Sequence, residues 1–463
     1  MEIDDKLVRT HRYPGWSEVL RISMPLIIAN SFWNLQLTID RIMLGNFSTD
    51  SLGAAVAVMG VFWTPMALLQ QTAGYSMTFV AQYFGARRKL EIGPLVWQSI
   101  YISVFGGLLF LLLIFVSDDI FEIMGHSNHM RILEDEYFSA LCFSALPTAI
   151  VAATSGFFTG LGRSQVIMWI NGVGLIANVI FDYFFIFGHG GLPVMGIAGA
   201  GYATALANCA AGAFALFLVF RKKNEEQFLM RSRWRFDFTL MKRFLKYGFP
   251  SGLQWSLEGM AFTAFLIMVG QMPNGDAALS ASGIAITVMM LAVLPAMGIG
   301  QGVSVLVGQH LGDDDPPKAV VAVWSGVQIA LIYIASMGIT FVLFPNFYLS
   351  WFHNPGNAQL WEEVSVIVPY LLMYVALFTL FDSMNFVFSF ALKGAGDTKF
   401  VTLVALVLPW PLMILPTWIF KDDVNAIYWA WGACSVFICS QALVFWRRFT
   451  GGLWKSMRVI GRG

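Results

Sequence analysis

Four acidic side chains lie inside long apolar runs of the sequence: Asp40, Asp182, Glu258 and Asp382. A carboxylate at the depth of a bilayer is costly unless it is paired, hydrated or protonated. Acids in such positions therefore mark ion paths or binding sites. Each of the four lies in a different run long enough to cross a membrane, so the combination predicts a protein that moves protons or cations through lipid.

Two of these acids form the core of a predicted cation or proton site. Asn178 and Asp182 are four residues apart and share a helix face, and the directions of the predicted spans place Asp40 and Thr204 at the same depth. Their oxygens suit a hard cation such as Na⁺, but two close carboxylates could equally exchange protons. Asn178 and Thr204 could instead be only interhelical hydrogen-bonding residues. Arg41, about 100° round the helix from Asp40, is expected to reach outward to the interface.

The other two acids predict a substrate site or a second ion site. Glu258 and Asp382 lie near the middle of predicted spans, and neither has a Lys or Arg at that depth in its own span. They could bind a cationic substrate or relay protons, or each could be a neutral acid hydrogen-bonded to a neighbouring helix. Pro25 precedes Asp40 by 15 residues. A proline in a helix interior permits a kink, so Pro25 is a candidate hinge or a static bend.

The elements that position these residues are predicted to be membrane helices. Hydrophobic residues make up 57% of the 463, and charged residues only 12%, against about 25% in soluble domains. The fold class predicted is all-α integral membrane. A spanning helix needs about 20 mainly apolar residues. Twelve such spans are predicted, at 20–44, 52–79, 93–116, 137–161, 166–188, 195–220, 244–270, 279–307, 319–344, 364–391, 400–420 and 425–446.

The basic residues predict the orientation of these spans. The N-terminal tail, the even-numbered loops and the C-terminal tail hold 25 of the 28 Lys and Arg residues, and the odd-numbered side has only Arg41, Arg131 and Lys421. By the positive-inside rule both termini are cytoplasmic. A basic stretch at 221–243 is read as a cytoplasmic linker between an N-terminal lobe, 1–220, and a C-terminal lobe, 244–463.

The two halves repeat one another at a nearly fixed offset. Pro25 matches Pro250 at an offset of 225, Gln82 and Gly85 match Gln309 and Gly312 at 227, and 160–162 matches 394–396 at 234. Because equivalent spans have the same direction, this is a parallel repeat. It predicts two six-helix lobes related by a pseudo-twofold axis around a central cavity, which favours a transporter over a channel.

The absent motifs disfavour an enzyme. The sequence contains no GxxxxGK[ST] phosphate loop, no HExxH and no GxSxG, so neither ATP hydrolysis nor metal-dependent or serine hydrolysis is indicated. No cofactor is expected other than the coupling ion, H⁺ or Na⁺. Nucleic acid is not an expected partner.

With these features in view, the chain resembles the multidrug and toxic compound extrusion (MATE) family over nearly its full length. The stretches that carry the resemblance are 25–45 with IDRIMLG, AQYFGARR at 81–88, NVIFDYFFIFG at 178–188, GIAGAGYAT at 196–204, YGFP at 247–250 and KGAGDT at 393–398. Family members carry a first-span acid that looks like Asp40 and a fifth-span pattern that looks like Asn178 and Asp182. Acids resembling Glu258 and Asp382 belong to the NorM-like branch, whereas the second fifth-span acid is more typical of DinF-like relatives. The tyrosine that the family has one turn before its first acid is Gln36 here.

The resemblance implies a secondary antiporter of the plasma (bacterial inner) membrane that exports amphipathic organic cations in exchange for H⁺ or Na⁺ by alternating access. A monomer in the lipid bilayer is expected. The alternative within the same superfamily (MOP) is a flippase for lipid-linked oligosaccharides. That alternative needs a cationic cavity for a pyrophosphate, and the cavity predicted here is acidic.

Overall fold

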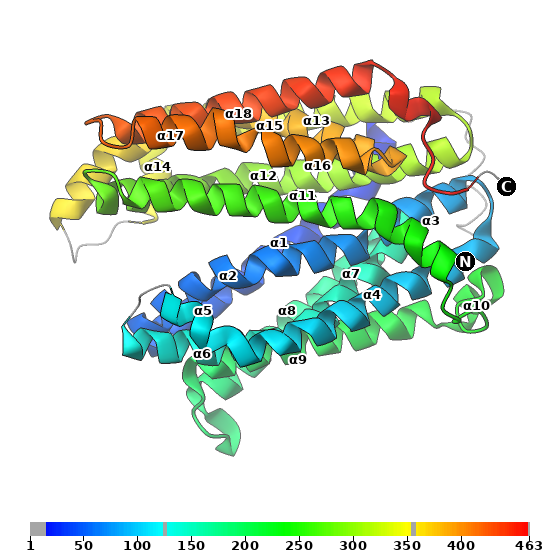
Figure 1. Cartoon of the computed structure of the whole chain (residues 1–463), viewed down its shortest axis with the longest axis horizontal. Helices are drawn as coiled ribbons and strands as arrows, with labels where there is room; N and C mark the ends of the chain where they lie inside the picture. Colours follow the sequence, from blue (N-terminus) through cyan, green and yellow to red (C-terminus); the bar gives the residue numbers. More distant parts are fainter. Residues whose placement is uncertain (1–14, 124–126, 353–357, 462–463) are drawn as a thin grey trace.

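The computed structural model describes residues 15–123, 127–352 and 358–461, and within these ranges the regular elements are all helices. Figure 1 shows two helical bundles lying against each other, one from each half of the chain. The all-helical, two-lobed fold predicted from the sequence is confirmed. The N-terminal lobe contains α1 (Trp16–Phe47), α2 (Thr49–Gly74), α3 (Ser76–Gly85), α4 (Ile92–Leu112), α5 (Ser117–Ile123), α6 (Asn128–Cys142), α7 (Ala145–Gly160), α8 (Ser164–Phe187) and α9 (Gly196–Val219). The C-terminal lobe contains α11 (Phe238–Gly270), α12 (Gly275–Gly312), α13 (Pro316–Leu343), α14 (Pro345–Ser350), α15 (Ala358–Ala395), α16 (Thr398–Val407), α17 (Leu415–Ile419) and α18 (Ala426–Thr450).

Most of these helices are long and apolar enough to cross a bilayer. Ten stretches of the described chain meet that condition, and α6 with α7, which meet at 41°, form an eleventh. The first predicted span corresponds to α1, which has 32 residues but is not among them. Asn30, Asn34 and Asp40 make α1 more polar than its neighbours. One of these polar residues, Asp40, belongs to the candidate site described below.

The predicted linker at 221–243 is largely structured. It contains α10 (Lys222–Phe228), and α11 begins within it at Phe238, with the Asp237 carboxylate accepting from the Leu240 N–H at 3.0 Å. The carboxylate of Glu225 accepts hydrogen bonds from the Ser232 hydroxyl and from the Arg231 N–H. These bonds hold the pKa of Glu225 below its ordinary value, because they stabilise the charged form.

The two lobes share a hydrophobic core at one end of the molecule only. We call this the basic end; it is the end with α3, α10 and the C-terminal segment 451–461 (Figure 1). There, residues of α3 such as Phe79 pack in one cluster with residues of α12 such as Val303 and with Leu392 of α15. Toward the opposite end each lobe has its own core, around Phe265 in one and Phe62 in the other. The lobes are therefore joined at the basic end and separately packed at the other.

Cross-lobe hydrogen bonds reinforce the junction at the basic end. Gln82 Nε2 donates to the Gly394 carbonyl at 3.0 Å, and Gln309 Nε2 donates to the Gly160 carbonyl at 2.8 Å. The Tyr75 hydroxyl, at the break between α2 and α3, donates to the Lys393 carbonyl at 2.7 Å. All three acceptors are backbone carbonyls near helix ends, where carbonyls lack intrahelical partners.

The C-terminal segment crosses the same junction. The Val459 N–H donates to Gln82 Oε1 at 2.8 Å, and Arg88 donates to the Gly461 carbonyl at 2.6 Å. Trp454 is buried against Phe449, with ring centroids 4.9 Å apart, so it anchors the segment to the end of α18. The tail of the C-terminal lobe is thereby fastened to α3 of the N-terminal lobe.

Candidate functional site

The first group of predicted site residues converges between α1 and α8. Asp40 of α1 is 5% exposed, and Asn178 and Asp182, one turn apart on α8, are 0% exposed. With its amide nitrogen turned toward the two acids, Asn178 donates to Asp40 Oδ1 at 2.7 Å and to Asp182 Oδ2 at 3.2 Å. The carboxylates also lie within hydrogen-bonding reach of each other. One neutral amide therefore bridges two buried acids.

No basic side chain neutralises this pair within the described residues. Neither acid takes part in an ion pair there, and Arg41 is exposed, in keeping with an outward orientation. Asp182 Oδ1 is buried and has no hydrogen-bond partner. Two adjacent buried carboxylates without a cation cannot both be charged at low cost, so the arrangement suits a shared proton or a bound cation.

Thr204 was predicted near this pair, and Tyr137 was not. Thr204 on α9 is half-buried, and no hydrogen bond in the described chain joins it to Asp40, Asn178 or Asp182. Tyr137 on α6 was not predicted; it is 3% exposed and close enough to both acids to sense their charge. Nothing in the spacing of Tyr137 along the chain relates it to α1 or α8. Its placement follows from the packing of α6 in the lobe.

The second group lies on a chain of hydrogen-bonded side chains across three helices of the C-terminal lobe. Glu258 Oε1 accepts from Gln254 Nε2 at 3.2 Å and from Gln441 Nε2 at 3.0 Å. Asn385 Nδ2 donates to Gln441 Oε1 at 2.9 Å and to Asp382 Oδ1 at 3.3 Å. Glu258 and Asp382 are each half-buried. Gln441 of α18 thus connects Glu258 of α11 to Asp382 of α15.

Lys393 is a second residue that was not predicted. It is the single buried Lys or Arg of the described residues, at 4% exposure. Its ammonium lies 4.1 Å from the ring centroid of Phe390 and 5.5 Å from that of Trp255, and its charge acts on Glu258. Lys393 falls outside the predicted span at 364–391 because α15 continues to Ala395. An internal cation therefore accompanies the acids of this lobe.

Pro25 lies within an unbroken α1 at a contact between the lobes. α1 runs from Trp16 to Phe47 through the buried Pro25. Ser23 and Ile27, on either side of the proline, face Gly302 and Gly298 of α12 so closely that a Cβ on either glycine would collide with them. A bend at Pro25 would therefore alter the contact between α1 and the other lobe. Its role as a hinge stays a prediction.

The residues that could hold a metal ion are few. The described chain contains no group of three or more His, Cys, Asp or Glu residues arranged to bind one. A cation at Asp40 and Asp182 would need the Asn178 side-chain oxygen or backbone oxygens as further ligands.

Both halves of the amino-acid sequence match the same known protein family. A model of the MatE family matches residues 25–184 and again 250–419. The chain belongs to the MatE family. The two MatE matches begin 225 residues apart, which is the offset between Pro25 and Pro250.

Individual MatE relatives cover most of the chain. A probable multidrug resistance protein NorM from Shewanella oneidensis is 29% identical over 85% of this chain and 84% of its own length. A probable multidrug resistance protein NorM from Thermotoga maritima is 23% identical over 96% of this chain and 94% of its own.

Solved transporter structures have the same fold. An outward-facing conformation of a multidrug resistance MATE family transporter of the MOP superfamily superposes with a TM-score of 0.86, at 20% identity, over 96% of this chain and 97% of its own. A MOP superfamily transporter from Pyrococcus furiosus, whose structure is described as having a binding pocket of reverse polarity, also gives 0.86, at 19% identity, over 96% and 98%.

Proposed function

We propose that this MatE protein is a secondary antiporter that exports amphipathic organic cations in exchange for H⁺ or Na⁺. The observation that carries the proposal is the pair Asp40 and Asp182, buried at 5% and 0% exposure, bridged by Asn178 and without a basic partner in the described chain. Buried carboxylates in a membrane helix bundle mark ion or substrate pathways and proton relays. The names of the NorM relatives support drugs as the exported class.

In this proposal the Asn178 amide responds to the state of the acids. With nitrogen toward Asp40 and Asp182 it donates to both, which stabilises the negative charge that the pair carries before an ion binds. With oxygen toward them it would add a neutral ligand to two carboxylates, which suits a bound Na⁺. If protons are the coupling ion, protonation of one acid removes the electrostatic repulsion between the two carboxylates.

The acids of the C-terminal lobe are proposed to receive the organic cation. Glu258 and Asp382 are half-buried, and Gln441 couples their positions through hydrogen bonds. Trp255 and Phe390 add aromatic faces, which attract cations, and in the present structure Lys393 lies against them. A flippase for lipid-linked oligosaccharides would need several buried cations to bind the pyrophosphate. Lys393 is the one buried Lys or Arg in the described residues, so the flippase alternative is not favoured.

The direction of transport is proposed from charge and packing. Most of the described Lys and Arg residues lie in the loops and the tail at the basic end, and by the positive-inside rule we propose that this end faces the cytoplasm. The lobes share a core only at that end, which supports our proposal that this conformation is closed to the cytoplasm. Pro25, at the contact of α1 with α12, is proposed to bend when the other state forms.

Transport in proteoliposomes tests the proposal. The wild-type protein should move ethidium uphill when either a pH gradient or a Na⁺ gradient is imposed, and applying the two separately identifies the ion. Asp40→Asn should abolish the uphill movement, whereas Asp276→Asn, which removes an exposed acid in the first turn of α12, should not. Uphill transport by Asp40→Asn at the wild-type rate, or movement only down the ethidium gradient in the wild type, would refute it.

A further inference from the structure

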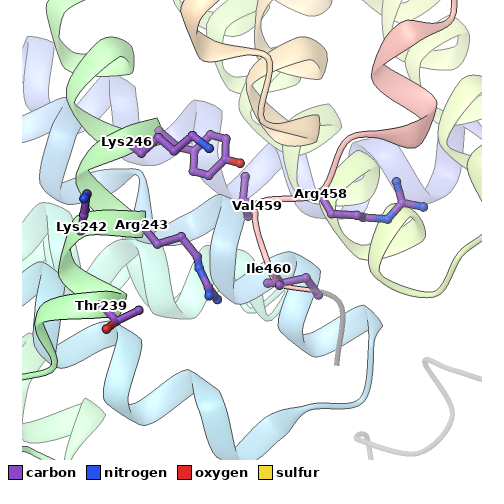
Figure 2. A pocket seen from close by; sticks show the side chains of 9 residues that line it. Thr239, Lys242, Arg243, Lys246, Arg458, Val459 and Ile460 are labelled. Atoms are coloured by element: carbon purple, nitrogen blue, oxygen red, sulfur yellow. The ribbon is translucent and has the colours of Figure 1, made fainter.

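A hollow of about 390 Å³ opens at the basic end between the first turns of α11 and the C-terminal segment (Figure 2). Nine residues line it, and four of them are the basic residues Lys242, Arg243, Lys246 and Arg458, while none is acidic. In Figure 2, Arg243 and Lys246 extend from α11 toward the C-terminal segment. The site described above does not use this hollow.

Among the described residues, three of the four positive charges lack a carboxylate partner. Arg458 donates to Asp314 Oδ1 at 2.9 Å and points toward that partner. Lys242, Arg243 and Lys246 form no ion pair with a described residue. Like charges this close repel one another, and the repulsion disfavours the arrangement unless an anion offsets it. The hollow therefore has the electrostatics of an anion site.

The surface next to the hollow is apolar, which distinguishes a lipid from a free anion. Lys242, Leu245, Lys246 and Phe249 are spaced i, i+3, i+4 and i+7, so they lie along one face of α11. Leu245 is 38% exposed and Phe249 is 47% exposed, and both lie within an apolar membrane-spanning helix. A ligand that matches this face has an anionic head beside the lysines and hydrocarbon beside Leu245 and Phe249.

We propose that this hollow binds the phosphodiester headgroup of an anionic phospholipid, with the acyl chains along the exposed apolar face of α11. The Thr239 hydroxyl, in the first turn of α11, is available as an additional donor. Because the headgroup would contact both α11 and the C-terminal segment, it would stabilise the attachment of that segment at the basic end. The proposal does not depend on the coupling ion or on the exported compound.

The test uses the full chain in nanodiscs of phosphatidylcholine with and without phosphatidylglycerol. Native mass spectrometry should find phosphatidylglycerol retained by the wild type in preference to phosphatidylcholine. The triple substitution Lys242→Gln, Arg243→Gln and Lys246→Gln should reduce that retention by on the order of tenfold or more, since each basic residue near a membrane surface adds to the attraction. The control Arg233→Gln, Lys399→Gln and Arg447→Gln removes three exposed charges outside the hollow and should retain the lipid. Equal loss in both triples, or no loss in the first, overturns the proposal.

Two further arms complete the test. Inorganic phosphate added to wild-type protein in phosphatidylcholine nanodiscs should not raise the unfolding temperature as phosphatidylglycerol does; an equal rise would identify a soluble phosphate as the ligand and overturn the lipid proposal. Should the triple substitution fail to fold, a photoreactive phosphatidylglycerol applied to the wild type decides the matter. Its crosslinks should map to 238–249, and their absence from that stretch overturns the proposal.

Discussion

Gln82 and Gln309 occupy equivalent positions in the two lobes, and each donates its side-chain amide to a backbone carbonyl of the opposite lobe. The acceptors, Gly394 and Gly160, are themselves equivalent in the repeat. The reciprocity extends to the glycines one turn on: a Cβ on Gly85 would collide with the Gln309 carbonyl, and a Cβ on Gly312 would collide with that of Gln82. The two lobes are thus joined at the basic end by a pair of contacts related by the repeat.

Removal of these amides should open the basic end. Gln82→Ala and Gln309→Ala should each weaken the closed state by about 1 kcal/mol, the net contribution of one hydrogen bond. Gln82→Ala should have the larger effect, because Gln82 Oε1 also accepts from Val459. Spin-label distances across the basic end report the populations, and Gln271→Ala, an exposed residue after α11, is the control. Unchanged distances in the double substitution would show that the bonds do not hold this end closed.

The bridge between the two acids of the N-terminal lobe predicts a coupling. Asn178→Ala should destabilise the protein by about 1–3 kcal/mol, since it leaves buried carboxylate oxygens without a donor. In an Asp40→Asn background the same change should cost much less, because a neutral amide replaces one of the charges. A double-substitution cycle of unfolding free energies in detergent measures the difference. Additive effects would mean that Asn178 does not bridge the acids.

Gln441 should connect the two acids of the C-terminal lobe. Gln441→Ala leaves Glu258 and Asn385 each without one partner, and should weaken binding of an organic cation about tenfold if the network positions both acids. Ser435→Ala is the matched control on α18, because within the described chain the Ser435 hydroxyl donates only to the Trp431 carbonyl of its own helix. Ethidium titration by fluorescence compares the two. Equal affinities for both variants would separate the network from substrate binding.

Two ion pairs at the basic end should differ in strength. Asp397 is 7% exposed and accepts two hydrogen bonds from Arg448, at 2.7 and 3.3 Å. Asp397→Ala should destabilise the protein by about 2 kcal/mol or more, because it leaves a guanidinium partly buried and unpaired. Asp314→Ala removes the partner of Arg458, but Asp314 is 88% exposed, and its loss should change stability by less than about 0.5 kcal/mol. Thermal unfolding of the two variants tests the order.

The span pattern could be predicted from the sequence because lipid imposes it. A bilayer requires continuous apolar runs with internally bonded backbones, and these runs identified the long helices. Asn178 and Asp182 could be paired because both lie on one helix at a four-residue spacing. α1, the helix that carries Asp40, shows where composition is a poor guide. It is too polar to be recognised as a membrane-spanning helix from its hydropathy alone.

The contacts between helices could not be predicted from apolar runs or from residue spacing. Gln254, Gln441 and Asn385 are neutral amides on α11, α18 and α15, and nothing in their spacing relates one helix to another. Lys393 was missed because α15 runs beyond the predicted span, and Tyr137 because its depth depends on how α6 packs. Thr204 was placed near the acids from depth alone, which does not determine the direction of a side chain round the helix axis.

The reciprocal glutamines bear on the ancestry of the fold. In a pair of identical chains related by a twofold axis, residue i contacts j in one direction and j contacts i in the other. One six-helix sequence with a single glutamine and a single glycine at these positions would make both bonds in such a dimer. Fusion of two copies would then preserve the two glutamine–carbonyl hydrogen bonds of that dimer, and each half could afterwards acquire its own acidic residues.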